Sequence, residues 1–178
     1  EGHLGNGTGD IAQNNGVRQL SLNADSLDGR PAHPDLAAIP GGVDAVVICG
    51  DLFDSNAQPR RSVEHAVTQL KRLTDVGIRV VVIPGTHDVY DGRSIYRAFD
   101  LRRMAGLPAG SDLLTVLTPE RPELLLEDLD LLIYGRVFGT KRAPHSPLAG
   151  FDVHHDDRAT WKVGMIHGSR RLPGVVDD

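Results

Sequence analysis

Two apolar segments and the amphipathic segment between them decide the fold: DAVVICGD at residues 44–51 and RVVVIPGTHD at residues 79–88. Each apolar run ends at a glycine followed by polar residues, which predicts a buried strand and then a turn. Between them, residues 60–76 place apolar side chains at intervals of three and four from Val63 to Leu73. This is the pattern of an amphipathic helix. The order of strand, helix and strand predicts one right-handed βαβ unit.

The rest of the chain extends this pattern. Two nearly continuous apolar strands predict a sheet that is covered on both faces, and therefore an α/β protein. Residues 138–150 are expected to form a loop, and residues 17–27 a short amphipathic stretch. The other expected elements are a helix at Ser94–Met104 and strands at Leu113–Leu117, Leu124–Leu126, Leu131–Val137 and Trp161–Ile166.

Composition excludes several classes of protein. The 178 residues carry a net charge of −5, which argues against a polybasic nucleic-acid binder but leaves room for a local basic groove. A single cysteine, Cys49, excludes a disulfide framework and a cysteine-rich zinc site. No apolar run approaches the roughly 20 residues of a membrane-spanning helix. With no stretch that reads as a signal peptide, we expect a cytoplasmic protein with no membrane partner.

Polar side chains cluster where the predicted strands end. The carboxyl ends of parallel strands share one edge of a sheet, where ligands bind. Carboxylates and imidazoles without thiolates suit Mn, Fe, Zn or Mg. A dinuclear hydrolytic site explains the set best, because a carboxylate must bridge two neighbouring dications. The residues concerned are Asp51 and Asp54 after the first strand, Thr86, His87 and Asp88 after the second, and His167 after the last.

Each side chain has an expected role in such a site. Asp51, at the tip of a buried strand, is the natural bridging ligand. His87 is the candidate general acid that protonates the leaving oxygen, and Asp88 is expected to orient it. Taken singly, these residues are more often structural: Gly-Asp forms turns, and an aspartate after a histidine caps helices. Their occurrence at successive strand ends favours the site.

The motifs resemble those of the calcineurin-like metallophosphoesterases. The matching segments are GDLFD at 50–54, GTHD at 85–88 and HG at 167–168. EGHLG at residues 1–5 resembles the D-x-H-L-G motif of SbcD-type DNA-repair exonucleases. The resemblance implies that residues 1–178 are one catalytic domain with a four-layer α/β/β/α sandwich of two mixed sheets. It also implies that this domain lacks its first strand and the C-terminal G-H-x-H region.

The resemblance further implies a site and partners. Glu1, His3, Asp51, Thr86 and His167 would hold two divalent metal ions, usually Mn²⁺, with Mg²⁺, Fe²⁺ or Zn²⁺ as alternatives. The implied reaction is phosphodiester hydrolysis, with DNA as the leading substrate. A homodimer and an SbcC-type ATPase partner are implied for the full-length protein. Beyond the resemblance, the basic pair Arg170 and Arg171, just after His167, is the best candidate for a phosphate-backbone contact.

Three departures from the family pattern keep other functions open. Position 1 is Glu where the family has Asp, position 86 is Thr where it has Asn, and G-H-x-H is absent. One alternative is a phosphoesterase that acts on a small phosphoester or a phosphoprotein, which the net negative charge favours. The other is a non-catalytic domain that binds without turnover.

Overall fold

A parallel three-stranded sheet lies at the centre of the computed structural model, which describes residues 13–14, 17–18, 42–142, 146–152 and 157–168. Its strands are β3 (Ala45–Cys49), β4 (Arg79–Ile83) and β5 (Leu114–Val116), in the order β3-β4-β5. Both pairs are parallel, with Ala45 opposite Arg79 and Val80 opposite Leu114. The predicted strands are therefore confirmed to within a residue or two at each end. Because all three run the same way, their carboxyl ends share one edge.

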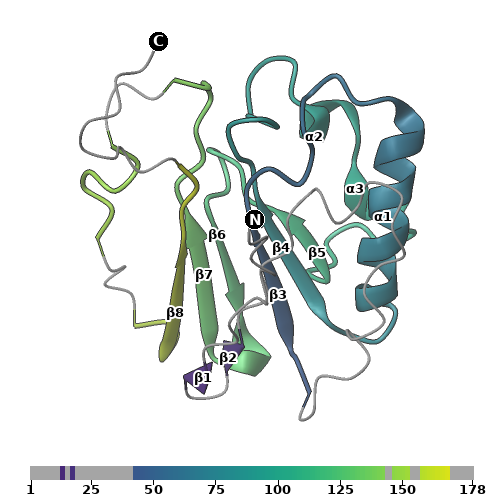
Figure 1. Ribbon diagram of the computed structural model, residues 1–178. Helices are drawn as coiled ribbons and strands as arrows, with labels where there is room; N and C mark the ends of the chain where they lie inside the picture. The colour runs from purple at the N-terminus through teal and green to yellow at the C-terminus, as the bar shows by residue number, and fades with distance from the viewer. Residues whose placement is uncertain (1–12, 15–16, 19–41, 143–145, 153–156, 169–178) are drawn as a thin grey trace, which may run out of the picture.

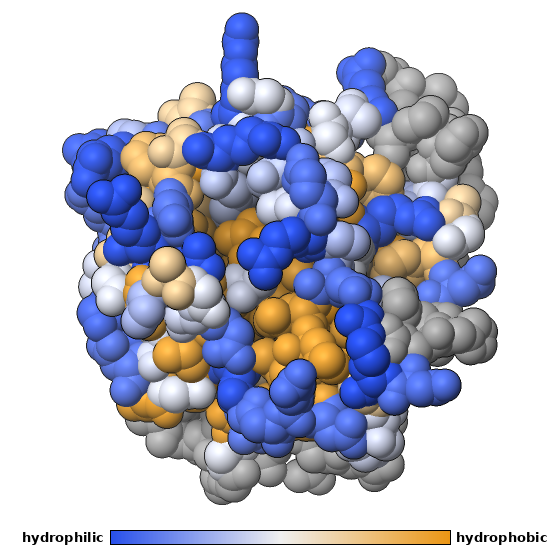
Figure 2. Space-filling model, turned by 180° about the vertical axis from the view of Figure 1, so that it is seen from behind, coloured by the Kyte–Doolittle hydropathy of each residue, from blue (hydrophilic) through white to orange (hydrophobic). Residues whose placement is uncertain are grey.

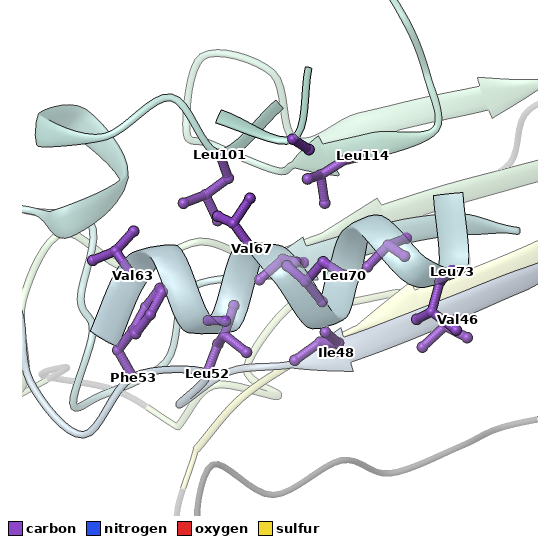
Figure 3. Close-up of a cluster of buried hydrophobic side chains, with 14 of the residues drawn as sticks. Val46, Ile48, Leu52, Phe53, Val63, Val67, Leu70, Leu73, Leu101 and Leu114 are labelled. Atoms are coloured by element: carbon purple, nitrogen blue, oxygen red, sulfur yellow. The ribbon is translucent and has the colours of Figure 1, made fainter. Parts of the chain in front are cut away.

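Helix α1 (Arg60–Thr74) connects β3 to β4 and covers one face of this sheet (Figure 1). It begins after Pro59 and ends two residues before the predicted limit, ahead of Gly77 with its positive φ of 82°. The predicted apolar stripe faces the sheet (Figure 3). Its buried members are Val63, Ala66, Val67, Leu70 and Leu73, which pack with Val46, Ile48, Leu52, Phe53 and Leu114 from the sheet and its loops.

A second sheet packs on the other face of the first. It contains β6 (Glu123–Leu126), β7 (Leu131–Gly135) and β8 (Trp161–Met165), with a 3-10 turn, η3 (Glu127–Leu129), between β6 and β7. Strand β6 is antiparallel to β7, and β8 is parallel to β7. The buried core between the two sheets consists of Val81, Ile83 and Leu117 from one side and Leu126, Leu131, Ile133 and Met165 from the other.

The α/β fold class is confirmed, with differences in detail. The described residues form three layers, helix, sheet and sheet (Figure 1), and no helix among them covers the outer face of the second sheet. Within the described residues the first sheet is wholly parallel rather than mixed. No helix in this part of the chain is long and apolar enough to cross a membrane.

The predicted helix at residues 94–104 is two separate turns. These are α2 (Ile95–Ala98) and α3 (Leu101–Met104). Phe99 adopts an extended conformation with φ of −129° and ψ of 120°, and the Asp100 side chain accepts a hydrogen bond from the Arg103 amide. An aspartate that caps a new helix interrupts the old one, which explains the error.

The first 41 residues contribute little to the described structure. Strands β1 (Gln13–Asn14) and β2 (Val17–Arg18) form a short antiparallel pair. The rest of the predicted stretch at residues 17–27 lies outside the described residues. Seen from behind, hydrophilic side chains cover much of the surface, and the largest apolar patch lies near the middle, with smaller apolar groups toward the left (Figure 2).

Replacing Ile133 tests the packing of the two sheets. Its side chain is fully buried between them, so Ile133→Ala should lower the free energy of unfolding by about 2–5 kcal/mol. The control is Val76→Ala, because Val76 is 72 % exposed and should contribute less than about 0.5 kcal/mol. Urea denaturation measures both. Equal losses would mean that the sheets do not pack face to face as described.

Candidate active site

The ends of β3, β4 and β8 bring three predicted metal-site side chains together. His167 follows β8, and its Nδ1 lies 2.8 Å from the carbonyl oxygen of Cys49 at the end of β3. The other ring nitrogen, Nε2, lies 3.2 Å from Oδ2 of Asp51 and 3.4 Å from Oγ1 of Thr86. The strand-end argument thus predicted correctly that residues separated by more than 80 positions meet at one edge.

The chemistry of this group fits a metal ion. A carbonyl oxygen only accepts hydrogen bonds, so His167 donates from Nδ1 and, when neutral, keeps the lone pair of Nε2 free. That lone pair faces the Asp51 carboxylate, which is also an acceptor. A divalent metal ion bound by both atoms would balance these two acceptors, as would a proton on Nε2. Carboxylate, imidazole and hydroxyl together suit a divalent metal.

The remaining predicted ligands lie outside the part of the chain that the structure describes. Glu1 and His3 lie outside the described residues, as do the proposed phosphate contacts Arg170 and Arg171. Within the described ranges, no three His, Cys, Asp or Glu side chains gather closely enough to hold a metal ion. Asp51 and His167, with Thr86 beside them, are therefore candidates for only part of a metal site.

Close approach of the loops depends on two glycines. Gly50 has a φ of +83°, and a Cβ at this position would lie 2.1 Å from Nδ1 of His167. A Cβ on Gly85 would lie 2.2 Å from Oδ1 of Asp51. Asp51 itself has a φ of +53°, which is unfavourable for a residue with a side chain. The surrounding contacts must therefore hold its backbone in place.

A buried carboxylate supplies those contacts. Asp88 has no exposed surface, and its Oδ1 accepts hydrogen bonds from the amides of Asp51 at 3.2 Å and Gly85 at 2.6 Å. Its Oδ2 accepts from the Phe53 amide at 3.1 Å and from the Tyr96 hydroxyl at 2.5 Å. Asp88 thereby joins the loop after β3 to the loop after β4.

The Tyr96 hydroxyl is suited to donate to this carboxylate. Burial of the phenol, followed by the charge of Asp88 and its hydrogen bond, raises the pKa of Tyr96 well above its ordinary value. The hydroxyl therefore stays protonated over the usual working range of pH. Sequence reasoning missed Tyr96, because an apolar position in a predicted helix gives no signal that its hydroxyl reaches a carboxylate eight residues earlier.

His87 lies at the surface of the site, beside Asp54. Its amide donates to Oδ1 of Asp51 at 2.9 Å, and its Nδ1 lies 3.0 Å from the Asp54 carbonyl oxygen and 3.6 Å from Oδ1 of the same residue. The His87 side chain is 56 % exposed, so the ring is accessible to a substrate. An exposed imidazole at this edge can exchange a proton with a ligand that binds there.

The partner of the His87 ring differs from the prediction. Asp88 was expected to orient it, but the Asp88 carboxylate points into the core, where three amides and a hydroxyl surround it. Asp54 takes that position instead. A signal was available in the sequence: Asp54 lies in the GDLFD segment, three residues after Asp51, in the loop that faces GTHD.

Asn56 also connects the loops, and no sequence motif singled it out. Its Nδ2 donates to the Val89 carbonyl at 2.9 Å, and its Oδ1 accepts from the Ile95 amide at 3.0 Å. Asn56 therefore ties the segment after β3 to the start of α2.

Asp51, Thr86 and His167 at the sheet edge, with the accessible His87 beside them, are the arrangement expected of a metallohydrolase-type domain. Comparison with protein families agrees: the profile described as Calcineurin-like phosphoesterase matches residues 9–169. The chain belongs to this family, which confirms the resemblance found in the motifs.

Curated relatives agree with the predicted placement near SbcD-type DNA-repair proteins. Three of them are named DNA double-strand break repair protein Mre11. The protein from Sulfolobus acidocaldarius is 41 % identical over 75 residues, 41 % of this chain and 20 % of that protein. The one from Sulfurisphaera tokodaii is 34 % identical over 102 residues, 52 % of this chain and 26 % of that protein. The Aeropyrum pernix protein is 51 % identical over 45 residues, 25 % of this chain and 11 % of that protein. The chain therefore spans about a quarter or less of these relatives.

Two glycines after β4 offer a matched test of the site. A Cβ on Gly85 would meet Oδ1 and the amide nitrogen of Asp51 at 2.2 and 2.4 Å, so Gly85→Ala must displace this ligand. We expect Mn²⁺ affinity to fall by about ten-fold or more, as measured by isothermal titration calorimetry. Gly92→Ala is the control, because a Cβ there meets no atom within 4 Å. Equal affinities in the two variants would contradict the described approach of Gly85 to Asp51.

Proposed function

We propose that this chain is the catalytic part of a metal-dependent phosphodiesterase that acts on DNA. The observation that carries the proposal is the convergence of Asp51, Thr86 and His167 at one edge of the sheet, with the accessible His87 beside them. Family membership supports phosphoester hydrolysis as the reaction class. The name shared by the curated relatives supports DNA as the substrate.

The proposed metal complement is two divalent ions, with Mn²⁺ as the first choice. Asp51, His167 and Thr86 would bind them, and the remaining ligands would come from Glu1 and His3. Bound divalent ions supply positive charge that polarises a phosphoryl oxygen and makes water a better nucleophile near neutral pH. The hydrogen bond from Nδ1 of His167 to the Cys49 carbonyl would hold the ring with Nε2 directed at the metal.

Proton transfer is the proposed task of His87. Its Nδ1 is engaged by Asp54, so the proton for the leaving oxygen would come from Nε2. Asp54 would hold the ring so that Nε2 points away from this contact. Asp88 would contribute indirectly, because its hydrogen bonds to the Asp51 and Gly85 amides hold the loops that carry Asp51 and His87.

The proposed partners rest on the same likeness to DNA-repair proteins. Arg170 and Arg171 would contact the phosphate backbone of DNA. An SbcC-type ATPase would be the protein partner, and the active form would be a homodimer. The rival substrate class is a small phosphoester or a phosphoprotein, favoured by the net charge of −5. Binding without turnover is the other rival, because Thr86 is a weaker ligand than an amide oxygen.

Replacing His87 tests the proposed reaction. With Mn²⁺ present, His87→Ala should lower the rate of oligodeoxynucleotide hydrolysis by about 10²–10⁴-fold, because the departing alkoxide needs a proton. Asp54→Asn should cause a smaller loss, because it removes only the charge beside the ring. The control is His65→Ala, since His65 is exposed on α1. Retention of full activity by His87→Ala would rule out its role as general acid. Absence of hydrolysis and of metal binding in the unaltered chain would favour the non-catalytic reading.

The salt dependence of DNA binding separates the substrate classes. Each phosphate contact releases counterions, so the affinity for duplex DNA should fall as salt rises, and Arg170→Ala with Arg171→Ala should make this dependence shallower. Fluorescence anisotropy at several salt concentrations measures the slope. The control pair is Arg102→Ala with Arg103→Ala on α3. If the chain binds DNA without salt dependence, or not at all, while it hydrolyses small phosphoesters, the DNA assignment is wrong.

A further inference from the structure

We propose that Tyr96 is a positioning residue for this site: its hydroxyl fixes the buried Asp88 carboxylate, which in turn fixes the loops that carry Asp51 and His87. The inference deepens the proposed function and rests on it for the identity of the site. Tyr96 lies in α2, outside the strand-end loops. Its hydroxyl donates to Asp88 and its ring packs against Phe53, neither of which is a proposed metal ligand.

The hydrogen bonds around Asp88 explain why this hydroxyl matters. Three of its four donors are backbone amides, from Asp51, Phe53 and Gly85, and the fourth is the Tyr96 hydroxyl. Each carboxylate oxygen receives two donors. Without the hydroxyl, Oδ2 would keep only the Phe53 amide in a fully buried position. A buried charged oxygen that loses a donor is costly, so the carboxylate would turn or admit water.

Movement of Asp88 would reach the metal site through the backbone. Asp51 holds an unfavourable positive φ, and its amide donates to Asp88. Gly85 donates to the same oxygen and lies against the Asp51 side chain. Because both loops share one carboxylate, a shift of that carboxylate changes their relative position, and with it the distance between Asp51 and the other ligands.

The ring of Tyr96 is held by contacts that do not involve its hydroxyl. The Tyr96 amide donates to the Ser94 hydroxyl oxygen at 3.3 Å. Its ring packs against Phe53, with centroids 5.9 Å apart and planes tilted by 56°. The neighbouring Ile95 is fully buried. Tyr96→Phe should therefore keep the packing and remove only the hydrogen bond to Asp88.

Hydrogen exchange in the metal-free chain tests the inference directly. In EDTA, Tyr96→Phe should increase the exchange rates of the Asp51, Phe53 and Gly85 amides by about ten-fold, the cost of one hydrogen bond to a charged group. Amides of β7 should be unaffected. Tyr90→Phe is the control, because the Tyr90 ring faces the Arg97 guanidinium at 4.2 Å rather than Asp88. Unchanged exchange at the three amides, or an equal increase in β7, would overturn the inference.

A second variant guards against misfolding of the first. Asp88→Ala should expose the same three amides, and adding Tyr96→Phe to it should increase exchange no further, since both act through one carboxylate. Additive effects would overturn the inference. So would continued protection of the three amides in Asp88→Ala.

Titration with Mn²⁺ alone separates this inference from the proposed function. Tyr96→Phe should weaken Mn²⁺ affinity by about ten-fold, and Tyr90→Phe should leave it unchanged. If the unaltered chain binds no Mn²⁺, the proposed function fails, while hydrogen exchange still decides the role of Tyr96. If the chain binds Mn²⁺ and Tyr96→Phe binds it equally well, the positioning role fails and the proposed function stands.

Discussion

The site depends on one buried carboxylate, that of Asp88. A charged group without exposed surface is tolerated only when hydrogen bonds replace its water, and Asp88 receives four. Three of these come from the backbone of two loops that are more than 30 residues apart in sequence. The requirement to satisfy the carboxylate therefore fixes the distance between the loops. The positive φ of Asp51 and the close approach of Gly85 are possible because that distance is fixed.

Sequence patterns predicted the parts of the fold that follow from hydrophobic burial. The strands around residues 45–49 and 79–83 and the helix that begins at Arg60 were recovered because their apolar residues follow the periods of buried strands and of a helix. The meeting of Asp51, Thr86 and His167 was predicted for a related reason. Parallel strands in one sheet, and the strand that packs beside them, end at the same edge.

Sequence patterns did not predict the features that depend on single hydrogen bonds. His87 and Asp88 are neighbours, and it was natural to pair them, yet adjacent side chains in a tight turn point in different directions. The Asp88 carboxylate points inward because it accepts hydrogen bonds from backbone amides, which no sequence pattern reveals. The His87 ring therefore contacts Asp54 instead. The break between α2 and α3 has the same origin, because the Asp100 side chain bonds to a nearby amide. Sequence periodicity indicates which residues are buried, whereas the orientation of Asp88 and the break between α2 and α3 depend on nearby hydrogen-bond donors.

The contact between His167 and the Cys49 carbonyl joins the end of one sheet to the end of the other. These residues are 118 positions apart, so they meet only after the second sheet has docked on the first. A chain in which only the βαβ unit has formed would have Asp51 and Thr86 but would lack the imidazole. Such long-range contacts form late in the folding of many small proteins. If His167 is a metal ligand, the complete metal site forms only once both sheets are assembled.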